Sequence, residues 1–398
     1  MQTSSTRGRY DARSIRALLA MGMGGFAIGT GEFVFMGLLP NVARDLHISI
    51  PDAGDLISAY AMGVAFGAPL LAVLCARWPR RTLLIVLAAF YAVANFTVAL
   101  MPSYWTVALA RFAAGFPHGT FFGVASLVAA TLAPKGRRSE AVGFVMLGLS
   151  IAILVGAPFA TWLGQVFTWR AAYFFVAGCA LVTAVMVRVW VPYLPPIAGA
   201  SPMREIGALR RPQVLLTLGT VAVGFGGMFC VFSYIKPTLV ELSGLDVSQV
   251  PLALALFGVG CVLSNLIGPR LADRALMKTI GGILVYAIVL LAVFGWLIRQ
   301  VPTALLGVFL LGGIGALAPA VQVRLMDVAG DAQTLAAALN HSAFNCANAL
   351  GAWLGGITIA AGFGWAALGW VGALLSVAGL GVFGLSIWQQ KRAMAHAA

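Results

Sequence analysis

The chain of 398 residues is 61% hydrophobic and only 9% charged, and its mean hydropathy is +0.96. A soluble domain carries about 45–50% apolar and about 25% charged residues, so a large buried core does not account for this composition. The net charge of +13 would suit a nucleic-acid partner, but the basic residues are not interleaved with aromatic residues in a nucleic-acid-binding pattern, and we expect no such partner.

Apolar runs of roughly 20 residues or more recur along the whole chain, and a helix of that length crosses about 30 Å of hydrocarbon. Their continuity excludes a transmembrane β-barrel, whose strands alternate apolar and polar residues over about 10 positions. We therefore predict an all-α integral membrane protein with twelve spans, at residues 16–40, 54–76, 82–101, 104–131, 140–164, 170–191, 213–241, 250–271, 279–298, 303–326, 333–361 and 365–388.

A polar, proline-rich connector, WVPYLPPIAGASPMREIGALRRP, separates the sixth and seventh predicted spans. It predicts an N-terminal six-helix bundle (1–191), a cytoplasmic linker (192–212) and a C-terminal six-helix bundle (213–398). With the N-terminus inside, 20 of the 25 Lys and Arg residues fall in inner segments. By the positive-inside rule we expect both termini in the cytoplasm.

The two halves repeat each other at several points. ARWPRR (76–81) matches DRALMK (273–278) and MGLLP (36–40) matches SYIKP (233–237), both at an offset of 197 residues; ATWLG (160–164) matches GAWLG (351–355) at an offset of 191. Parallel duplication of six spans is typical of transporters whose substrate site lies near the bilayer midplane, although channels also contain repeats.

Signatures of other classes are missing from the sequence. The five cysteines are scattered without the spacing of a disulfide framework or a metal site, so we expect no metal. Paired carboxylates, HExxH, GxSxG and a Walker loop are absent, which argues against an intramembrane enzyme and against ATP as the driving force. A channel lacks support because no ring of charge or repeated filter loop is visible.

Four motifs in chain order carry a resemblance to a known family. They are GTGEFVFMGLLPNVARDL in the first span, ARFAAGFPHGTFFG in the fourth, LVGAPFATWLGQVFTWR in the fifth and LNHSAFNCANALGAWLGG in the eleventh. Together they resemble the major facilitator superfamily, and within it the drug:proton antiporters of the sugar-efflux (arabinose-efflux-like) branch.

This resemblance implies two pseudo-twofold-related six-helix bundles that work by alternating access. It implies a secondary transporter that exports a drug, sugar or nucleoside-like molecule by proton antiport, without a cofactor and with the proton gradient as energy source. The implied partners are the small-molecule substrate, protons and the lipid bilayer of a bacterial inner membrane, and we expect a monomer. A proton-independent uniporter or a symporter is the alternative of the same class.

The loop after the second span departs from the family pattern, GxxxDRxGRR. Here Ala76 replaces the acid that, in the family, holds a neighbouring helix end in one gating state, and the acidic version survives only in the second half. The resemblance makes gating candidates of Arg77, Arg80, Arg81, Asp273 and Arg274, and of Gly156 and Pro158 in the antiporter motif. For the three first-half arginines we favour the simpler interpretation as topology charges.

Glu32 is the only one of the twelve acids that lies well inside a predicted span. A carboxylate in hydrocarbon must face a cavity, find a partner or be protonated. Counted from Pro40 and Pro102, Glu32 and Arg111 lie at the same depth, roughly 12–13 Å below the outer surface. The resemblance brings their helices together at the central cavity. We predict a Glu32–Arg111 pair whose carboxylate exchanges protons; the alternative is a permanent ion pair that only orders the bundle.

His118 follows Arg111 by seven residues, on the same helical face, and an imidazole titrates near neutral pH. It is a candidate to relay protons or bind substrate; equally, it could be a neutral histidine bonded to a backbone carbonyl. Lys236, about one turn from the outer end of its span, either faces the cavity or extends to the surface, which we favour.

Polar groups on an apolar wall are typical of small-molecule sites. On this ground Asn340 and Asn345 are candidate substrate-binding residues, whereas for His341 and Asn348 we prefer a role in joining helices. The other candidate lining residues are Tyr60, Phe121, Phe122, Tyr234 and Gln322, although for the aromatic ones packing is the commoner role.

Overall fold

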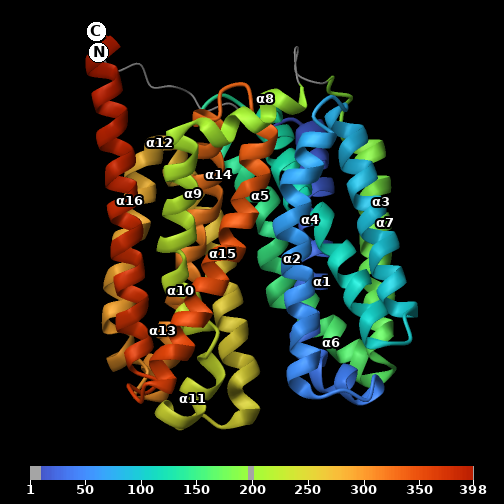
Figure 1. Cartoon of the computed structure of the whole chain (residues 1–398), viewed down its shortest axis with the longest axis vertical. Helices are drawn as coiled ribbons and strands as arrows, with labels where there is room; N and C mark the ends of the chain where they lie inside the picture. Colours follow the sequence, from blue (N-terminus) through green and yellow to red (C-terminus); the bar gives the residue numbers. More distant parts are fainter. Residues whose placement is uncertain (1–9, 196–200, 398) are drawn as a thin grey trace.

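The computed structural model describes residues 10–195 and 201–397, and the described residues form helices and short connections with no strand among them. Most helices run roughly parallel to one axis, with their connections at the two ends of the molecule (Figure 1). Residues 1–9 and 196–200, which include part of the predicted linker and the first basic residues of the chain, lie outside the described residues.

The first six predicted spans correspond to helices on one side of the molecule. The fifth is one continuous rod of three pieces, in which a π-helical turn precedes Pro158. The elements are α1 (Ala12–Asp45), α2 (Ile50–Leu74), α3 (Arg80–Leu100), α4 (Tyr104–Leu132), α5 (Arg138–Ile151), η1 (Ala152–Gly156), α6 (Ala157–Val166) and α7 (Trp169–Trp190). The gating candidates Gly156 and Pro158 lie at the end of this π-helical turn and just after it, and local π adjustments are one way in which membrane helices accommodate proline.

The linker forms two short helices, α8 (Pro202–Ile206) and η2 (Gly207–Arg210). The last six spans follow as α9 (Pro212–Gly224), α10 (Gly226–Phe232), α11 (Ile235–Ser243), η3 (Val247–Gln249), α12 (Val250–Leu297), α13 (Val301–Gly313), η4 (Ile314–Ala316), α14 (Leu317–Val328), α15 (Gln333–Ala360) and α16 (Ala367–Ala397).

Ten described helices are long and apolar enough to cross a membrane. One of them, α12, covers both the eighth and ninth predicted spans, which meet at Ala275, where φ −158° and ψ 77° are not helical. The eleventh span is α15, which is not among the ten because its asparagines and histidine lower its mean hydropathy. The twelve predicted spans are thus all helical.

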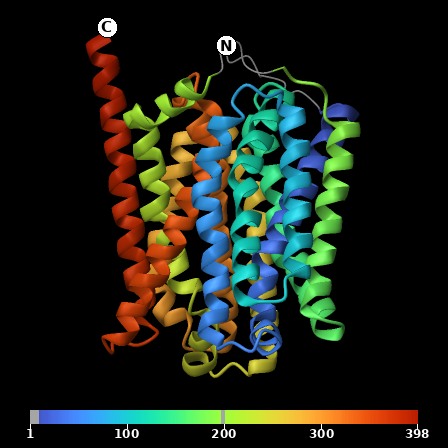
Figure 2. The same ribbon diagram turned by 45° about the vertical axis from the view of Figure 1, so that its right-hand side comes forward.

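Contacts between the two bundles concentrate toward one face. We call this the terminal face: α1 begins there at Ala12, α16 ends there at Ala397, and α8 lies across it (Figure 1). The contacts join α4 and α2 to α15, and α5 to α12 and α14. At the other end, α6 packs against α1 and α7, and α11 against α12 and α13, within their own bundles. Turning the molecule leaves α16 at its edge, extending past its neighbours at the terminal face (Figure 2). The bundles are therefore closed on each other at the terminal face.

Glycines permit this closure, and the fourth span shows how. A Cβ on Gly123 would lie 2.7 Å from the backbone nitrogen of Ala338 in α15, and one on Gly119 would lie 3.0 Å from the Ala338 oxygen. Small residues allow membrane helices to pack backbone against backbone, and here they do so between the bundles.

Candidate functional site

Arg111 is the eighth residue of α4 and is fully buried. Its guanidinium donates to two backbone carbonyls, Gly31 of α1 at 3.0 Å and Leu56 of α2 at 3.3 Å, and to the Tyr173 hydroxyl at 3.4 Å. Nη2 has no hydrogen-bond partner among the described residues. One arginine thus ties four helices of the first bundle together.

Aromatic rings surround the same guanidinium. Its central carbon lies 4.6 Å from the ring centroid of Tyr60, 4.8 Å from that of Phe35 and 5.9 Å from that of Tyr173. A desolvated cation–π contact contributes about 2 kcal/mol or more. Carbonyl oxygens and π-faces therefore stabilise a buried cation here, and no carboxylate of the described residues forms an ion pair with it.

Glu32 is the neighbour of Gly31 in α1, and its side chain is partly exposed. None of the ion pairs within 4.0 Å among the described residues includes it, so the direct Glu32–Arg111 pair predicted from matched depth and the family resemblance is wrong in this conformation. Depth was matched, but successive helix residues point about 100° apart, and it is the Gly31 carbonyl that meets Arg111. The two charges still interact over a longer distance.

His118 connects the arginine site to the other bundle. The Tyr60 hydroxyl lies 3.0 Å from its Nδ1, and its Nε2 lies 3.3 Å from Nδ1 of His341 in α15. Both histidines are buried, and Phe122 stacks on His341 with ring centroids 4.4 Å apart. The partners of His118 are therefore side chains and not the backbone carbonyl of our alternative. The predicted helix-joining role of His341 extends across the bundle interface.

The amides predicted to bind substrate are partly occupied by one another. Asn340 Nδ2 donates to Gln322 Oε1 at 2.5 Å, and Gln322 Nε2 donates to the Ala337 carbonyl at 3.1 Å. Both side chains are fully buried. Asn345 is partly exposed, and its Nδ2 donates to the His341 carbonyl at 2.9 Å. In this closed arrangement Asn345 is thus the more accessible amide.

Of the remaining candidate lining residues, Phe121 meets the ring of Phe122 edge-on, with ring centroids 6.2 Å apart. Phe121 is buried against Gly24 of α1, where a Cβ would lie 2.1 Å from its ring. The Tyr234 hydroxyl donates to the Ala352 carbonyl of α15 at 2.8 Å. Lys236 is exposed on α11, at the face opposite the terminal face, and is not brought to the arginine site.

The charged gating candidates lie at the terminal face, whereas Gly156 and Pro158 lie within the fifth span. Asp273 accepts hydrogen bonds from the backbone N–H groups of Ser139 at 2.6 Å and Glu140 at 3.0 Å, the first turn of α5 in the other bundle. Nearby, Arg138 and Asp327 form an ion pair at 2.5 Å between the bundles. Asp273 thus has the structural position expected for an acid that holds a helix end.

The basic candidates make fewer contacts. Arg80 donates to Thr131 at 3.3 Å, Arg81 donates to the Arg188 carbonyl, and Arg77 and Arg274 are exposed. The first-half arginines thus contact only their own bundle through these bonds. A Cβ on Gly156 would lie 2.2 Å from Thr30 Oγ1, which shows how closely the π-helical turn approaches α1.

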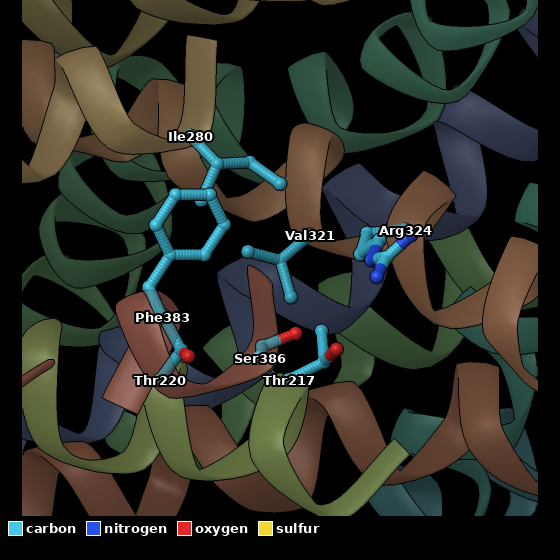
Figure 3. Close-up of a pocket in the computed structure, with 7 residues that line it drawn as sticks. All are labelled: Thr217, Thr220, Ile280, Val321, Arg324, Phe383 and Ser386. Carbon is cyan, nitrogen blue, oxygen red and sulfur yellow. The ribbon is translucent and has the colours of Figure 1, made fainter. Parts of the chain in front are cut away.

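Arg324 is a buried cation that sequence reasoning counted only as a basic residue of the inner side. Its Nη2 donates to Gln213 at 3.0 Å and Gln390 at 2.9 Å, and with Thr217, Ser386 and apolar side chains it lines a cavity of about 10 Å³ (Figure 3). That volume holds about one water molecule, so this cavity is too small for a transported solute.

Comparison with known proteins agrees with this architecture. The sequence profile of the Major Facilitator Superfamily matches residues 21–297. The chain is 40% identical to the "Inner membrane transport protein YdhP" of Escherichia coli over 366 residues, 91% of this chain and 93% of that protein. It is 28% identical to a "Probable sugar efflux transporter" of Helicobacter pylori, over 94% and 96% of the two chains. The solved proton:xylose symporter XylE is similar in fold, with a TM-score of 0.75 over 95% of this chain and 96% of that one, at 16% identity.

Proposed function

The chain belongs to the major facilitator superfamily, and on this premise we propose that this multi-pass membrane transporter exports a small molecule in exchange for protons. The substrate class is a drug, sugar or nucleoside-like solute, and the relative named for sugar efflux supports export. The protein acts as a monomer in a bacterial inner membrane, with the terminal face in the cytoplasm, as the distribution of Lys and Arg favours.

The observation that carries the proposal is an acid, the partly exposed residue Glu32, deep in α1 and one residue from the carbonyl that a fully buried Arg111 binds. Because Arg111 already has two carbonyl acceptors and three aromatic rings, it does not need Glu32 as a structural counter-ion. A carboxylate within a membrane span that is not used in this way is costly, and its retention indicates a functional group. We assign Glu32 the exchange of protons.

A continuous set of contacts leads from Arg111, whose charge interacts with Glu32 over a longer distance, to the bundle interface. Tyr60 packs its ring on Arg111 and places its hydroxyl on His118, which in turn meets His341 across the interface. A change of charge at Glu32 alters the field on Arg111, and these contacts offer a route by which protonation biases closure. Coupling between the proton and the conformational change needs such a two-state element.

The test uses purified protein in proteoliposomes. Glu32→Gln is expected to abolish uphill efflux driven by an imposed pH gradient while exchange of substrate across the membrane continues, because only the proton site is removed. Glu32→Asp should retain part of the coupling. Asp246→Asn, which alters an exposed loop acid, is the matched control. Intact proton-driven efflux in Glu32→Gln would refute the proposal.

Proton flux also separates the alternatives. An antiporter releases protons into the compartment that the substrate leaves, a symporter moves protons together with substrate, and a uniporter moves none. A panel of candidate solutes, each assayed by the pH change it causes, therefore identifies both the mode of transport and the substrate class.

A further inference from the structure

The repeat in the sequence relates two helix ends at the terminal face. Ala76 and Asp273 are equivalent positions, 197 residues apart. The first turn of α5 contains Ser139 and Glu140 as its second and third residues, and the first turn of α15 contains Thr334 and Leu335 in the same places. Asp273 holds the first of these turns across the bundle interface, so twofold symmetry would have residue 76 hold the second.

The side chain of Ala76 cannot accept a hydrogen bond. The first turn of α15 nevertheless has a carboxylate acceptor, from another residue. The backbone N–H of Leu335 donates to Oε2 of Glu205 at 2.8 Å, and Thr334 also hydrogen-bonds this carboxylate. Glu205 belongs to the linker helix α8 and is only 2% exposed. A carboxylate at the amino end of a helix satisfies unpaired N–H groups and interacts favourably with the helix dipole.

The linker is fixed to both bundles. Helix α8 packs against α2 in the first bundle and against α15 in the second. Upstream in the linker, the carbonyl of Leu194 accepts from the backbone N–H of Arg80 at 3.2 Å, and the charge of Arg80 also acts on Glu205. Arg204, the residue before Glu205, forms an ion pair with Asp331 at 3.0 Å. The contact of Glu205 with α15 therefore joins the second bundle to a linker helix that also packs on the first bundle, whereas Asp273 joins the two bundles directly.

We propose that Glu205 is a gating residue that replaces the acid missing at position 76, so that the linker supplies the second of two equivalent locks on the terminal face. Asp273 locks α5 to the second bundle, and Glu205 locks α15 to the linker and, through it, to the first bundle. Releasing either lock favours opening of this face. The inference uses the proposed alternating access only to define the open form of this face, and it does not depend on proton coupling.

The test measures distance across the terminal face and not transport. Spin labels at Lys135→Cys and Lys391→Cys, both exposed positions in different bundles, report the separation in a background without the five native cysteines. Glu205→Ala is expected to raise the population of the long-distance, open form about tenfold, as Asp273→Ala should, because each removes a hydrogen-bonded charged group from the closed form. Glu205→Gln, which keeps one acceptor oxygen, should lie between Glu205→Ala and the parent protein.

The decisive variant adds Ala76→Asp to Glu205→Ala, and it should restore the short distance by returning the acid to the loop. Glu241→Ala, an acid at the opposite face bonded by Trp365 within its own bundle, controls for loss of a carboxylate. An unchanged distance in Glu205→Ala while Asp273→Ala opens would overturn the proposal, as would failure of Ala76→Asp to restore closure. Efflux in Glu32→Gln tests proton coupling, whereas these distances test the two locks. Failure of one proposal can therefore be told from failure of the other.

Discussion

Replacing Gly123 with alanine should open the terminal face. The added Cβ would lie 2.7 Å from the backbone nitrogen of Ala338, and the helices would have to separate by about 0.7 Å to restore an ordinary contact of 3.4 Å. The opposing atom is backbone and cannot rotate away, so the cost falls on the closed form. Overpacking of this kind costs about 1–3 kcal/mol, which corresponds to roughly a 5- to 150-fold shift toward the open form.

The helix-forming advantage of alanine over glycine, about 1 kcal/mol, is present in both forms and therefore cancels from the equilibrium between them. The assay is the distance distribution between labels at Lys135 and Lys391. Gly178→Ala in α7 is the matched control, because a Cβ there meets no atom within 4 Å. An unchanged distribution in Gly123→Ala would show that the close approach of α4 and α15 does not control closure.

Three further predictions concern the polar groups. Arg111→Lys should lower transport at least tenfold, because an ammonium cannot reach two carbonyls and a hydroxyl while lying on the rings; initial rates of uptake into inverted vesicles measure this. His118→Ala should lower the unfolding free energy by about 1–3 kcal/mol, since it leaves the Tyr60 hydroxyl and His341 without this partner; thermal unfolding in detergent checks it. Burial raises the pKa of Glu205. The hydrogen bonds from α15 and the charge of Arg80 lower it, but the effect of burial is the larger. The part of closure that depends on protonation of Glu205 should thus be full below the ordinary carboxyl pKa and be lost as pH rises through the raised one, while the hydrogen bond from Leu335 remains. The distance distribution followed over pH should show this partial weakening, and Glu205→Gln should abolish the pH dependence.

The twelve spans and their order were predictable because length and hydropathy are properties of the sequence alone. The contacts that each face of a helix makes are not predictable in this way. Glu32 and Arg111 were placed at one depth, but the direction in which each points depends on packing, and the guanidinium meets the carbonyl of Gly31 instead. Tyr173 and Phe35, which complete this site, carry no sequence signal that separates them from other aromatic residues in spans.

Contacts between distant segments were the least accessible to sequence reasoning. His341 was expected to join helices, but its partner, 223 residues away, was not identifiable. Glu205 was treated as one charge in a polar linker, because only the folded chain brings α8 to the first turn of α15. The repeat did carry a usable signal. An acid is present at Asp273 and missing at the equivalent Ala76, which indicates that another group must bind the first turn of α15.

Arg111 is held by carbonyl oxygens and aromatic rings, and this affects the net charge of the site. None of the ion pairs within 4.0 Å among the described residues includes Arg111, so its charge and that of Glu32 act on the site from separate positions. The two residues together sum to zero when Glu32 is ionised and to +1 when it is protonated. A cationic solute near this site is repelled by the protonated form, whereas a neutral solute is indifferent to the change. Selectivity by charge should therefore vary with pH, and uptake of neutral and cationic solutes of similar size measures it.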